Sequence, residues 1–178
     1  MSTLFKTYCL DANVLIQAWQ KYYSPKLCPS YWEVLNQLGE QGRIFISKAV
    51  YDEITRTDDD LAKWLKVSKI PVREIDEAVA DCLKNIYAKD SSHQKLVDST
   101  KQRSLADPWV IAHAMKEGAI VVTKEEKVTA ANSNKVKIPN VCENMGIIWM
   151  NDFQFVEEMG IEFSCQIPRS GGAPHQAT

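Results

Sequence analysis

Short apolar runs alternate with longer helix-like segments along this chain, and acidic residues stand where several of the runs end. Residues 8–10 stop at Asp11, and residues 12–16 then continue as a largely apolar segment, so a buried strand is expected to end in a turn that opens a helix. Residues 119–123 form a β-branched run of the length of a fully buried strand, with Glu125 two residues later. Strands separated by helices require crossover connections, so the alternation predicts an α/β fold with a mostly parallel central sheet.

Two further acids stand at comparable positions. Asp107 directly precedes Pro108, and a Pro at the first helical position after an Asp cap is a strong signal for a helix start. Glu53 follows the apolar run 44–46, in the first turns of a helix expected over 48–56. Open α/β sheets bind ligands in the crevice at the carboxyl ends of their strands. We therefore expect a shared cleft for four acids, namely Asp11, Glu53, Asp107 and Glu125.

The same periodicities predict the remaining elements of one domain. Strands are expected at residues 5–10, 43–46, 119–123, 136–138 and 147–149. Helices are expected at residues 14–20, 30–41, 48–56, 59–67, 75–89, 92–103, 108–117, 139–145 and 151–159. A chain of 178 residues is long enough to bury a sizeable core. The domain is expected to span residues 1–164, and residues 165–178, which are rich in Pro and Gly and lack apolar periodicity, to form a disordered tail.

Composition excludes several classes of protein. The five cysteines are scattered and never form a Cys-x-x-Cys pair, which argues against a disulfide framework and against a zinc site. No segment approaches the roughly eighteen apolar residues that a membrane span requires, and the chain does not begin like a secretory signal. A cytoplasmic protein without a membrane partner is expected.

A net charge of −2 at first counts against a nucleic-acid partner, because phosphate binding depends on basic surface. A nuclease built on carboxylates is a partial exception, since bound divalent ions invert the local potential. The basic residues that could flank such a cleft are Lys101 and Arg103, then Lys63, Lys66, Lys69 and Arg73, and finally Lys124, Lys127, Lys135 and Lys137.

Clustered carboxylates imply a cation. Two like charges 4 Å apart repel by about 4 kcal/mol at an effective dielectric constant near 20. Such a cluster therefore holds protons or recruits a cation, and oxygen ligands without His or Cys select the hard ions Mg²⁺ or Mn²⁺.

Four segments together resemble a known family. They are Leu10 to Ile16, Tyr51 to Ile54, Ala106 to Ala114 and Val121 to Glu125. In this order they are similar to the motifs of the PIN domain, a family of metal-dependent ribonucleases, and the resemblance covers residues 7 to about 150. Many family members carry Asp in the fourth motif, where this chain offers Glu125 or Glu126. Residues 137–142 resemble a subfamily related to the toxins of bacterial toxin–antitoxin pairs.

The resemblance implies a three-layer α/β/α fold with a sheet of four to five strands. It implies an endoribonuclease that uses Mg²⁺ or Mn²⁺ to hydrolyse RNA phosphodiester bonds, leaving 5′-phosphate and 3′-hydroxyl ends. The catalytic and metal-binding residues would be Asp11, Glu53, Asp107 and Glu125. A toxin of this kind would have an antitoxin protein as its partner, and a homodimer through the helices around residues 30–66 is a further expectation.

Two other functions stay open. Phosphohydrolases of the haloacid dehalogenase type also begin with a strand-terminal Asp, but their motif has a second Asp where this chain has Asn13. A non-catalytic PIN-like scaffold would be expected to lose one or more of the acids, and all four positions here are acidic.

Individual residues also have simpler interpretations. Asp11 and Asp107 could be helix caps, and Asp52 competes with its neighbour Glu53. The Thr123 hydroxyl could orient a nearby carboxylate. His113 and Trp109 share an apolar helix, and both are expected to be packing residues rather than a catalytic base and a base-stacking platform.

Overall fold

The computed structural model describes residues 6–97, 105–130 and 133–165, and within them five strands form one parallel sheet. The strands are β1 (Tyr8–Leu10), β2 (Ile44–Ser47), β3 (Val72–Arg73), β4 (Ile120–Val122) and β5 (Trp149–Met150). Their order in the sheet is β3-β2-β1-β4-β5, and every neighbouring pair is parallel. The predicted parallel sheet is therefore confirmed.

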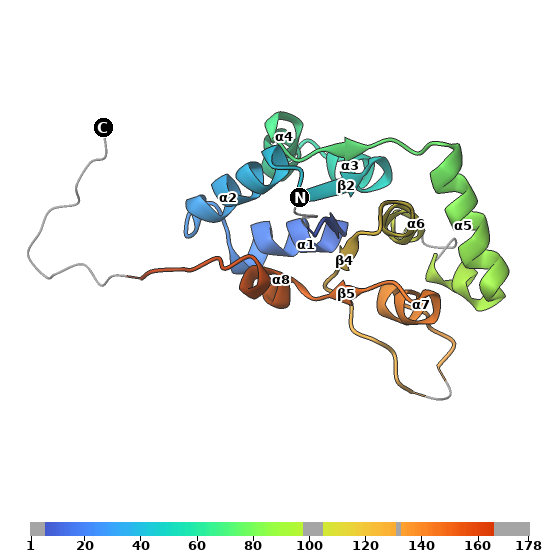
Figure 1. The fold of residues 1–178 in the computed structure, drawn as a ribbon. Helices are drawn as coiled ribbons and strands as arrows, with labels where there is room; N and C mark the ends of the chain where they lie inside the picture. The colour runs from blue at the N-terminus through green and yellow to red at the C-terminus, as the bar shows by residue number, and fades with distance from the viewer. Residues whose placement is uncertain (1–5, 98–104, 131–132, 166–178) are drawn as a thin grey trace, which may run out of the picture.

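Helices cover both faces of this sheet. They are α1 (Ala12–Gln17), the π-helical turn η1 (Ala18–Tyr22), α2 (Pro29–Glu40), α3 (Lys48–Thr55), α4 (Asp60–Val67), α5 (Glu77–Lys89), the 3₁₀ helix η2 (Ser91–Leu96), α6 (Asp107–Glu117), α7 (Ile138–Met145) and α8 (Asp152–Glu158). Figure 1 shows α5, α6 and α7 on one side of the sheet and α2 and α8 on the other. The three-layer α/β/α arrangement is thus as predicted.

Burial on both faces explains why the central strands are continuously apolar. Every residue of β1, β2 and β4 is buried, as expected for parallel strands between two helical layers. Helix α6 packs along the middle of the sheet and carries His113, which is fully buried at 6.4 Å from the ring of Phe45. Among the described residues neither ring nitrogen of His113 has a hydrogen-bond partner, and burial lowers its pKa. His113 and the half-buried Trp109 are therefore packing residues, as expected.

One expected strand is absent from the structure, and one strand of the structure was not expected. The strand expected at 136–138 is wrong, because Pro139 occupies the first turn of α7 and the helix already begins at Ile138. The edge strand β3 was missed, because two residues that are only partly covered carry no alternating pattern. β3 is defined by its partner instead, with Val72 paired to Ile46.

Some expectations fall outside the part of the chain that the structure describes. The helix expected at 92–103 begins as the 3₁₀ helix η2, and its residues 98–103 lie outside the described residues. The same is true of residues 166–178 of the expected tail. In the three described stretches, no helix is both long and apolar enough to cross a membrane.

Candidate metal centre

The register of the central strands brings Asp11 next to Thr123. Leu10 pairs with Val122, so the residues that follow them leave the sheet side by side. The Asp11 amide donates to the Val122 carbonyl at 2.9 Å, and the Thr123 hydroxyl donates to Asp11 Oδ2 at 3.0 Å. The expectation that Thr123 orients a carboxylate is therefore confirmed.

Asp11 does not use its carboxylate to cap α1. Its backbone carbonyl accepts from the Val14 amide at 3.1 Å, whereas its side chain makes no capping hydrogen bond. The side chain is fully buried, and among the described residues Oδ1 has no hydrogen-bond partner. A buried carboxylate oxygen without a partner is costly, so the position calls for either a proton or a cation.

The electrostatics of Asp11 agree with this view. Burial raises its pKa from 3.8 to about 7, against the opposing effects of the Thr123 hydroxyl and the nearby Ala12 amide. The negative charges of Glu125 and Glu53 raise it further. A carboxyl group that titrates near neutrality between two other acids is typical of a functional site.

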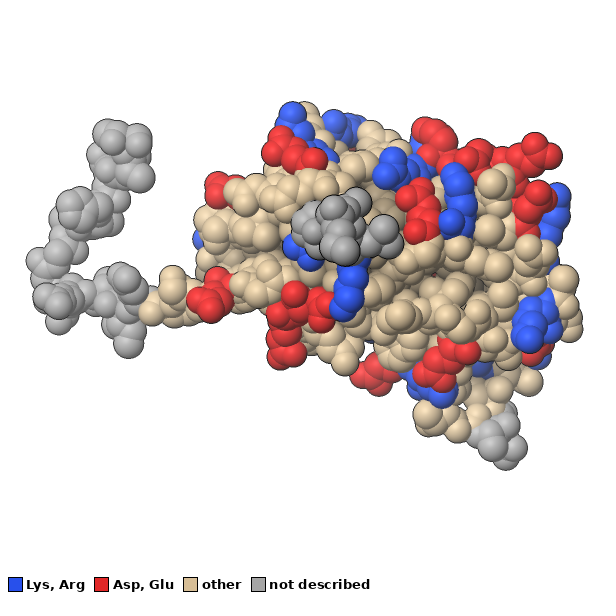
Figure 2. Space-filling view, in the orientation of Figure 1, with Lys and Arg blue, Asp and Glu red and all other residues tan. Residues whose placement is uncertain are grey.

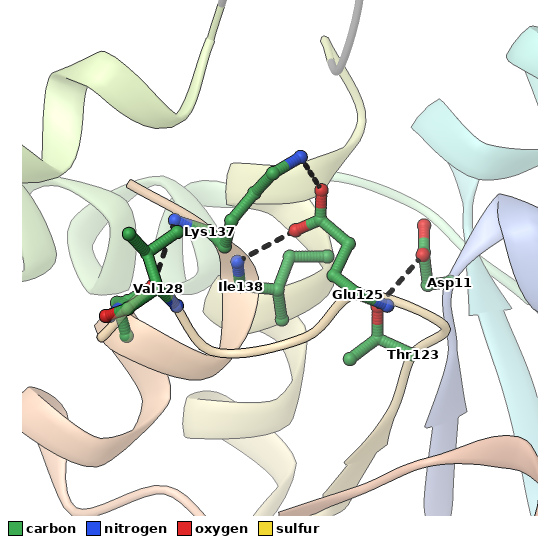
Figure 3. A network of polar contacts seen from close by, with 7 residues as sticks. Asp11, Thr123, Glu125, Val128, Lys137 and Ile138 are labelled. Carbon is green, nitrogen blue, oxygen red and sulfur yellow. Dashed lines mark hydrogen bonds and ion pairs between the residues drawn. The ribbon is translucent and has the colours of Figure 1, made fainter. Parts of the chain in front are cut away.

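Glu125 lies next to Thr123 and Asp11, with Lys137 on its other side, as Figure 3 shows. Its amide donates to the Thr123 hydroxyl at 3.1 Å. One carboxylate oxygen pairs with the Lys137 ammonium, and the other accepts from the Ile138 amide at 2.8 Å. Glu126 is exposed instead, so Glu125 is the acid that the structure brings to the cluster.

Glu53 reaches the site from α3, and its place in that helix differs from the expected one. The helix starts at Lys48 with Ser47 as its cap, so Glu53 lies near the carboxyl end rather than in the first turns. The helix dipole disfavours an acid there. Burial raises the pKa of Glu53. Asp52, in contrast, is exposed and pairs with Lys48.

Glu53 also borders a cavity of about 450 Å³. Its apolar wall is formed by Ile16, Trp19 and Leu61, together with Ile54. Asp59 and Asp60 add negative charge at its edge. The cavity therefore combines an apolar wall with an acidic rim beside the carboxylate cluster.

Asp107 differs from its expected role as a helix cap. Ala106 occupies the cap position, and Asp107 is itself the first residue of α6, followed by Pro108. Only 5% of the surface of Asp107 is exposed. Burial lowers the pKa of Lys137, but its bond to Glu125 and the negative charges of Glu125, Asp107 and Asp11 outweigh burial and raise it. Three of the predicted acids thus raise the pKa of the same lysine. The fourth, Glu53, acts on this group of charges by raising the pKa of Asp11.

Lys137 is the residue at this site that sequence analysis did not single out. It belonged to a general set of flanking basic residues and to the segment 137–142, but nothing in the pattern marks a lysine twelve residues after Glu125 as the partner of that acid. Lys124 serves a different contact: it forms a buried ion pair with Asp152, and its ammonium lies over the rings of Tyr22 and Phe153.

The other predicted basic residues do not form a continuous basic field. Ion pairs engage Lys63, Lys66, Arg73 and Lys127. Figure 2 shows acidic and basic side chains intermingled on one face of the molecule. Lys101 and Arg103 lie outside the described residues.

The candidate donors are of the chemical type that a hard divalent ion prefers, but the structure does not group them closely. In the described ranges, no three His, Cys, Asp or Glu side chains are grouped closely enough to hold a metal ion. All candidate donors are carboxylate oxygens, as Mg²⁺ and Mn²⁺ prefer. The buried Oδ1 of Asp11, which has no hydrogen-bond partner among the described residues, is a second and independent sign of a cation site. Half-buried Glu53 can change its rotamer on binding more readily than Asp11.

Comparisons with known proteins agree with the fold. A family model described as "Domain of unknown function (DUF4411)" matches residues 8–163. No curated protein matches the chain significantly.

Solved structures are similar at low sequence identity. VapBC2 from Rickettsia felis, bound to a DNA fragment from its promoter, has a TM-score of 0.53 at 18% identity, over 82% of this chain and 98% of that one. FitAcB from Neisseria gonorrhoeae has a TM-score of 0.53 at 15% identity, over 83% and 99% of the two chains. VapBC-1 from nontypeable Haemophilus influenzae has a TM-score of 0.53 at 15% identity, over 83% and 98%. The fold is that of PIN domains, as the motifs predicted.

Proposed function

The chain belongs to the family described as "Domain of unknown function (DUF4411)", and we propose that it is a divalent-metal-dependent endoribonuclease. The observation that carries the proposal is the buried carboxylate of Asp11. One of its oxygens is oriented by Thr123, the other has no partner in the described residues, and the charges of Glu53 and Glu125 act on it. This is the environment expected of a ligand for a cation at the carboxyl edge of a parallel sheet.

Each side chain has a distinct role in this proposal. Asp11, Glu53 and Asp107 would hold Mg²⁺ or Mn²⁺. When bound, the ion supplies an activated water and stabilises negative charge on the scissile phosphate. Thr123 holds Asp11 in one orientation, so that its other oxygen faces the ion. Glu125 fixes the segment that leads from β4 to α7 through Lys137 and the Ile138 amide.

The reaction follows from this arrangement and from the resemblance to PIN ribonucleases. The oxygen of water forms a bond to phosphorus, and the bond from phosphorus to the 3′-oxygen breaks. The products carry a 5′-phosphate and a 3′-hydroxyl group. The three ligand carboxylates are too acidic to protonate the leaving oxygen when they bind a cation, so that proton comes from water.

The first prediction concerns Glu53 and its neighbour. Glu53→Gln is expected to lower Mn²⁺-dependent cleavage of single-stranded RNA by about 100-fold, because a ligand charge is lost from a site where the ion contributes several kcal/mol. Asp52→Asn is the control, since it removes the same charge from the adjacent exposed position. Cleavage is followed on end-labelled RNA with Mn²⁺ and with excess chelator.

The control variant is expected to cleave like the wild-type chain, and chelator to stop both. Equal rates for Glu53→Gln and Asp52→Asn would remove Glu53 from the site. Activity that resists chelator would contradict a metal-dependent mechanism. A pure, folded wild-type chain without any cleavage would favour the scaffold alternative.

A protein partner is a further part of the proposal. The resemblance to toxin nucleases and the fold shared with VapBC and FitAcB structures support an antitoxin that holds the nuclease inactive in the cytoplasm. The cavity beside Glu53 suits a segment with apolar and cationic side chains, because Trp19 and Leu61 provide an apolar wall and Asp59 and Asp60 an acidic rim. An Arg from that segment could pair with the carboxylate cluster and exclude the ion.

The expected result for the partner is that a small protein co-purifies with the chain expressed from its native operon. Leu61→Glu would place a negative charge in the apolar wall of the cavity and is expected to release that protein. Size-exclusion chromatography of the complex also reports whether two copies of the chain are present. A chain that purifies alone from its operon, and whose expression does not slow growth, would contradict the toxin part of the proposal.

A further inference from the structure

Two exposed aromatic side chains meet at the edge of the sheet. Tyr22 is the last residue of η1, and Phe153 lies in the first turn of α8. The centroids of their rings are 5.7 Å apart, and the ring planes meet at 78°. Tyr22 is 43% exposed and Phe153 is 48% exposed, so both side chains remain accessible to a ligand. Single exposed hydrophobic residues are common on proteins, but adjoining exposed rings offer a continuous apolar surface.

A buried ion pair adjoins these rings. The Lys124 ammonium lies 4.2 Å from the centroid of the Tyr22 ring and 4.4 Å from that of the Phe153 ring. It also donates to both carboxylate oxygens of Asp152, at 2.9 and 2.8 Å. The side chains of Lys124 and Asp152 are only 10% and 3% exposed. Because a cation over a ring is attracted to it, these contacts hold the two rings in one arrangement before any ligand binds.

The charges around the rings favour a nucleobase over a phosphate as the group that contacts them. The charge of Lys124 is balanced by Asp152, so a phosphate would gain little there. A nucleobase, in contrast, can stack on an aromatic ring whatever its identity. Phosphates would find cations to either side, because Lys21 and Lys26 are exposed and form no ion pair within the described ranges. Rings flanked by cations are typical of sites that bind single-stranded nucleic acid.

The rings also adjoin the proposed catalytic site. Thr123 directs its hydroxyl to Asp11, whereas the next residue, Lys124, directs its ammonium to the rings. The Cα atoms of consecutive residues are only about 3.8 Å apart. Asp152 and Phe153 follow β5 as Thr123 follows β4, so the rings and Asp11 stand at the same edge of the sheet. A strand of RNA bound at Asp11 can therefore extend over the rings.

We propose that Tyr22 and Phe153 form a stacking platform for an unpaired base of the RNA substrate. This inference rests on the proposed ribonuclease function and deepens it, because the platform restricts the substrate to RNA whose bases are unpaired beside the cleavage point. Stacking on these rings requires neither a metal ion nor the acidic residues, so RNA binding can be measured without an ion. Trp109, the aromatic residue that sequence analysis considered for this role, packs against the core instead.

The first test measures RNA binding by the full chain in excess chelator. Fluorescence anisotropy follows a labelled, unstructured RNA of about ten nucleotides. Tyr22→Ala and Phe153→Ala are each expected to bind this RNA about tenfold more weakly, because each removes a ring on which a base stacks. Tyr22→Phe and Phe153→Tyr keep a ring and should bind like wild type. Ile148→Ala is the control, since Ile148 is 66% exposed but precedes β5 rather than following it.

The second test identifies which part of the RNA contacts the rings. An RNA of the same length that lacks all of its bases keeps its phosphates but cannot stack. Wild type is expected to bind it at least about tenfold more weakly than normal RNA. Tyr22→Ala should bind this abasic RNA as wild type does, because the ring and the base contribute only together. Tyr22→Leu and Phe153→Leu keep apolar bulk without a ring, and they replace any alanine variant whose thermal unfolding shows a loss of fold.

Cleavage of the normal RNA in Mn²⁺ provides a third readout. Tyr22→Ala and Phe153→Ala are expected to raise KM by about tenfold and to change kcat by less than about threefold. That is the pattern for loss of a contact that is equally strong in the ground state and the transition state. A loss of kcat alone would assign the rings to the chemical step and contradict the platform.

Other outcomes would overturn the inference in different ways. Equal affinities of Tyr22→Ala, Phe153→Ala and Ile148→Ala for normal RNA would remove the platform, and an equal loss on abasic RNA would show a contact with the backbone. Release of the operon-encoded partner by Tyr22→Ala, with RNA affinity unchanged, would assign the rings to a protein interface. A wild-type chain that binds RNA through the rings but cleaves none would refute the proposed activity and still support the platform. A wild-type chain that binds no RNA would overturn both.

Discussion

Asp11→Asn is expected to abolish RNA cleavage, with a loss of about a thousandfold or more in kcat. Asparagine keeps the shape of the side chain and can still accept the hydrogen bond from Thr123, but it removes the charge that a divalent ion requires. Because the ion contributes several kcal/mol to stabilising the transition state, its loss outweighs any other single change at the site. The measurement is single-turnover cleavage of end-labelled RNA at saturating Mn²⁺.

A matched control separates this effect from a general change of charge. Asp81→Asn removes the same charge from the exposed surface of α5, where Asp81 pairs with Lys84, and should leave cleavage unchanged. The same variants test the cellular part of the proposal. Expression of the wild-type chain alone should slow growth, whereas the Asp11→Asn chain should not. Cleavage by Asp11→Asn at the wild-type rate would rule out Asp11 as the central ligand.

Metal-free wild-type protein is expected to lose stability as the pH rises from about 4 to about 7. The pKa of Asp11 is 3.8 in its ordinary state and about 7 in the folded chain, mainly because of burial. Between these values the folded state binds more protons than the unfolded state, so the free energy of unfolding falls with rising pH. Each unit of difference between the two pKa values corresponds to about 1.4 kcal/mol, so the decrease in the free energy of unfolding approaches roughly 4 kcal/mol above pH 7.

The comparison with Asp11→Asn isolates this contribution from other titrating groups. The variant has no carboxyl group at position 11, so it is expected to be more stable than wild type at pH 8 in the presence of chelator. The difference should shrink towards pH 5, and Mn²⁺ should stabilise wild type but not the variant at pH 8. Urea unfolding at several pH values measures the difference in the free energy of unfolding between the two proteins. If the free energy of unfolding changed with pH in the same way for both proteins from pH 5 to 8, ionisation of Asp11 would cost the folded state little stability.

Much of the fold could be predicted because it depends on local patterns. Central strands buried on both faces are continuous apolar runs, which made β1, β2 and β4 recognisable. The Pro signal at Pro108 marked the start of α6 to within one residue. The edge strand β3 left no such signal, because its two residues are defined by pairing with β2 rather than by burial.

Sequence alone placed Asp11 directly after β1 and Glu125 shortly after β4, but it misjudged the local surroundings of the other two acids. Asp107 was expected to cap α6, yet it is the first residue of the helix. Glu53 was placed in the first turns of α3 and lies near its end. The start of α6 depends on which backbone groups find partners, and it lies one residue earlier than expected. Helix α3 begins at Lys48 as expected, so for Glu53 it was the position within the helix that was misjudged.

What the sequence by itself determined is the α/β alternation, the parallel sheet and the positions of Asp11 and Glu125 after the strands β1 and β4. Only the tertiary structure decided how those acids are engaged. The bond between Thr123 and Asp11 joins residues 112 positions apart, and it exists because Leu10 and Val122 share a register. Lys137 reaches Glu125 because α7 begins beside the end of β4. Pairings between distant residues and the burial of one carboxylate oxygen depend on how elements pack, which no local pattern records.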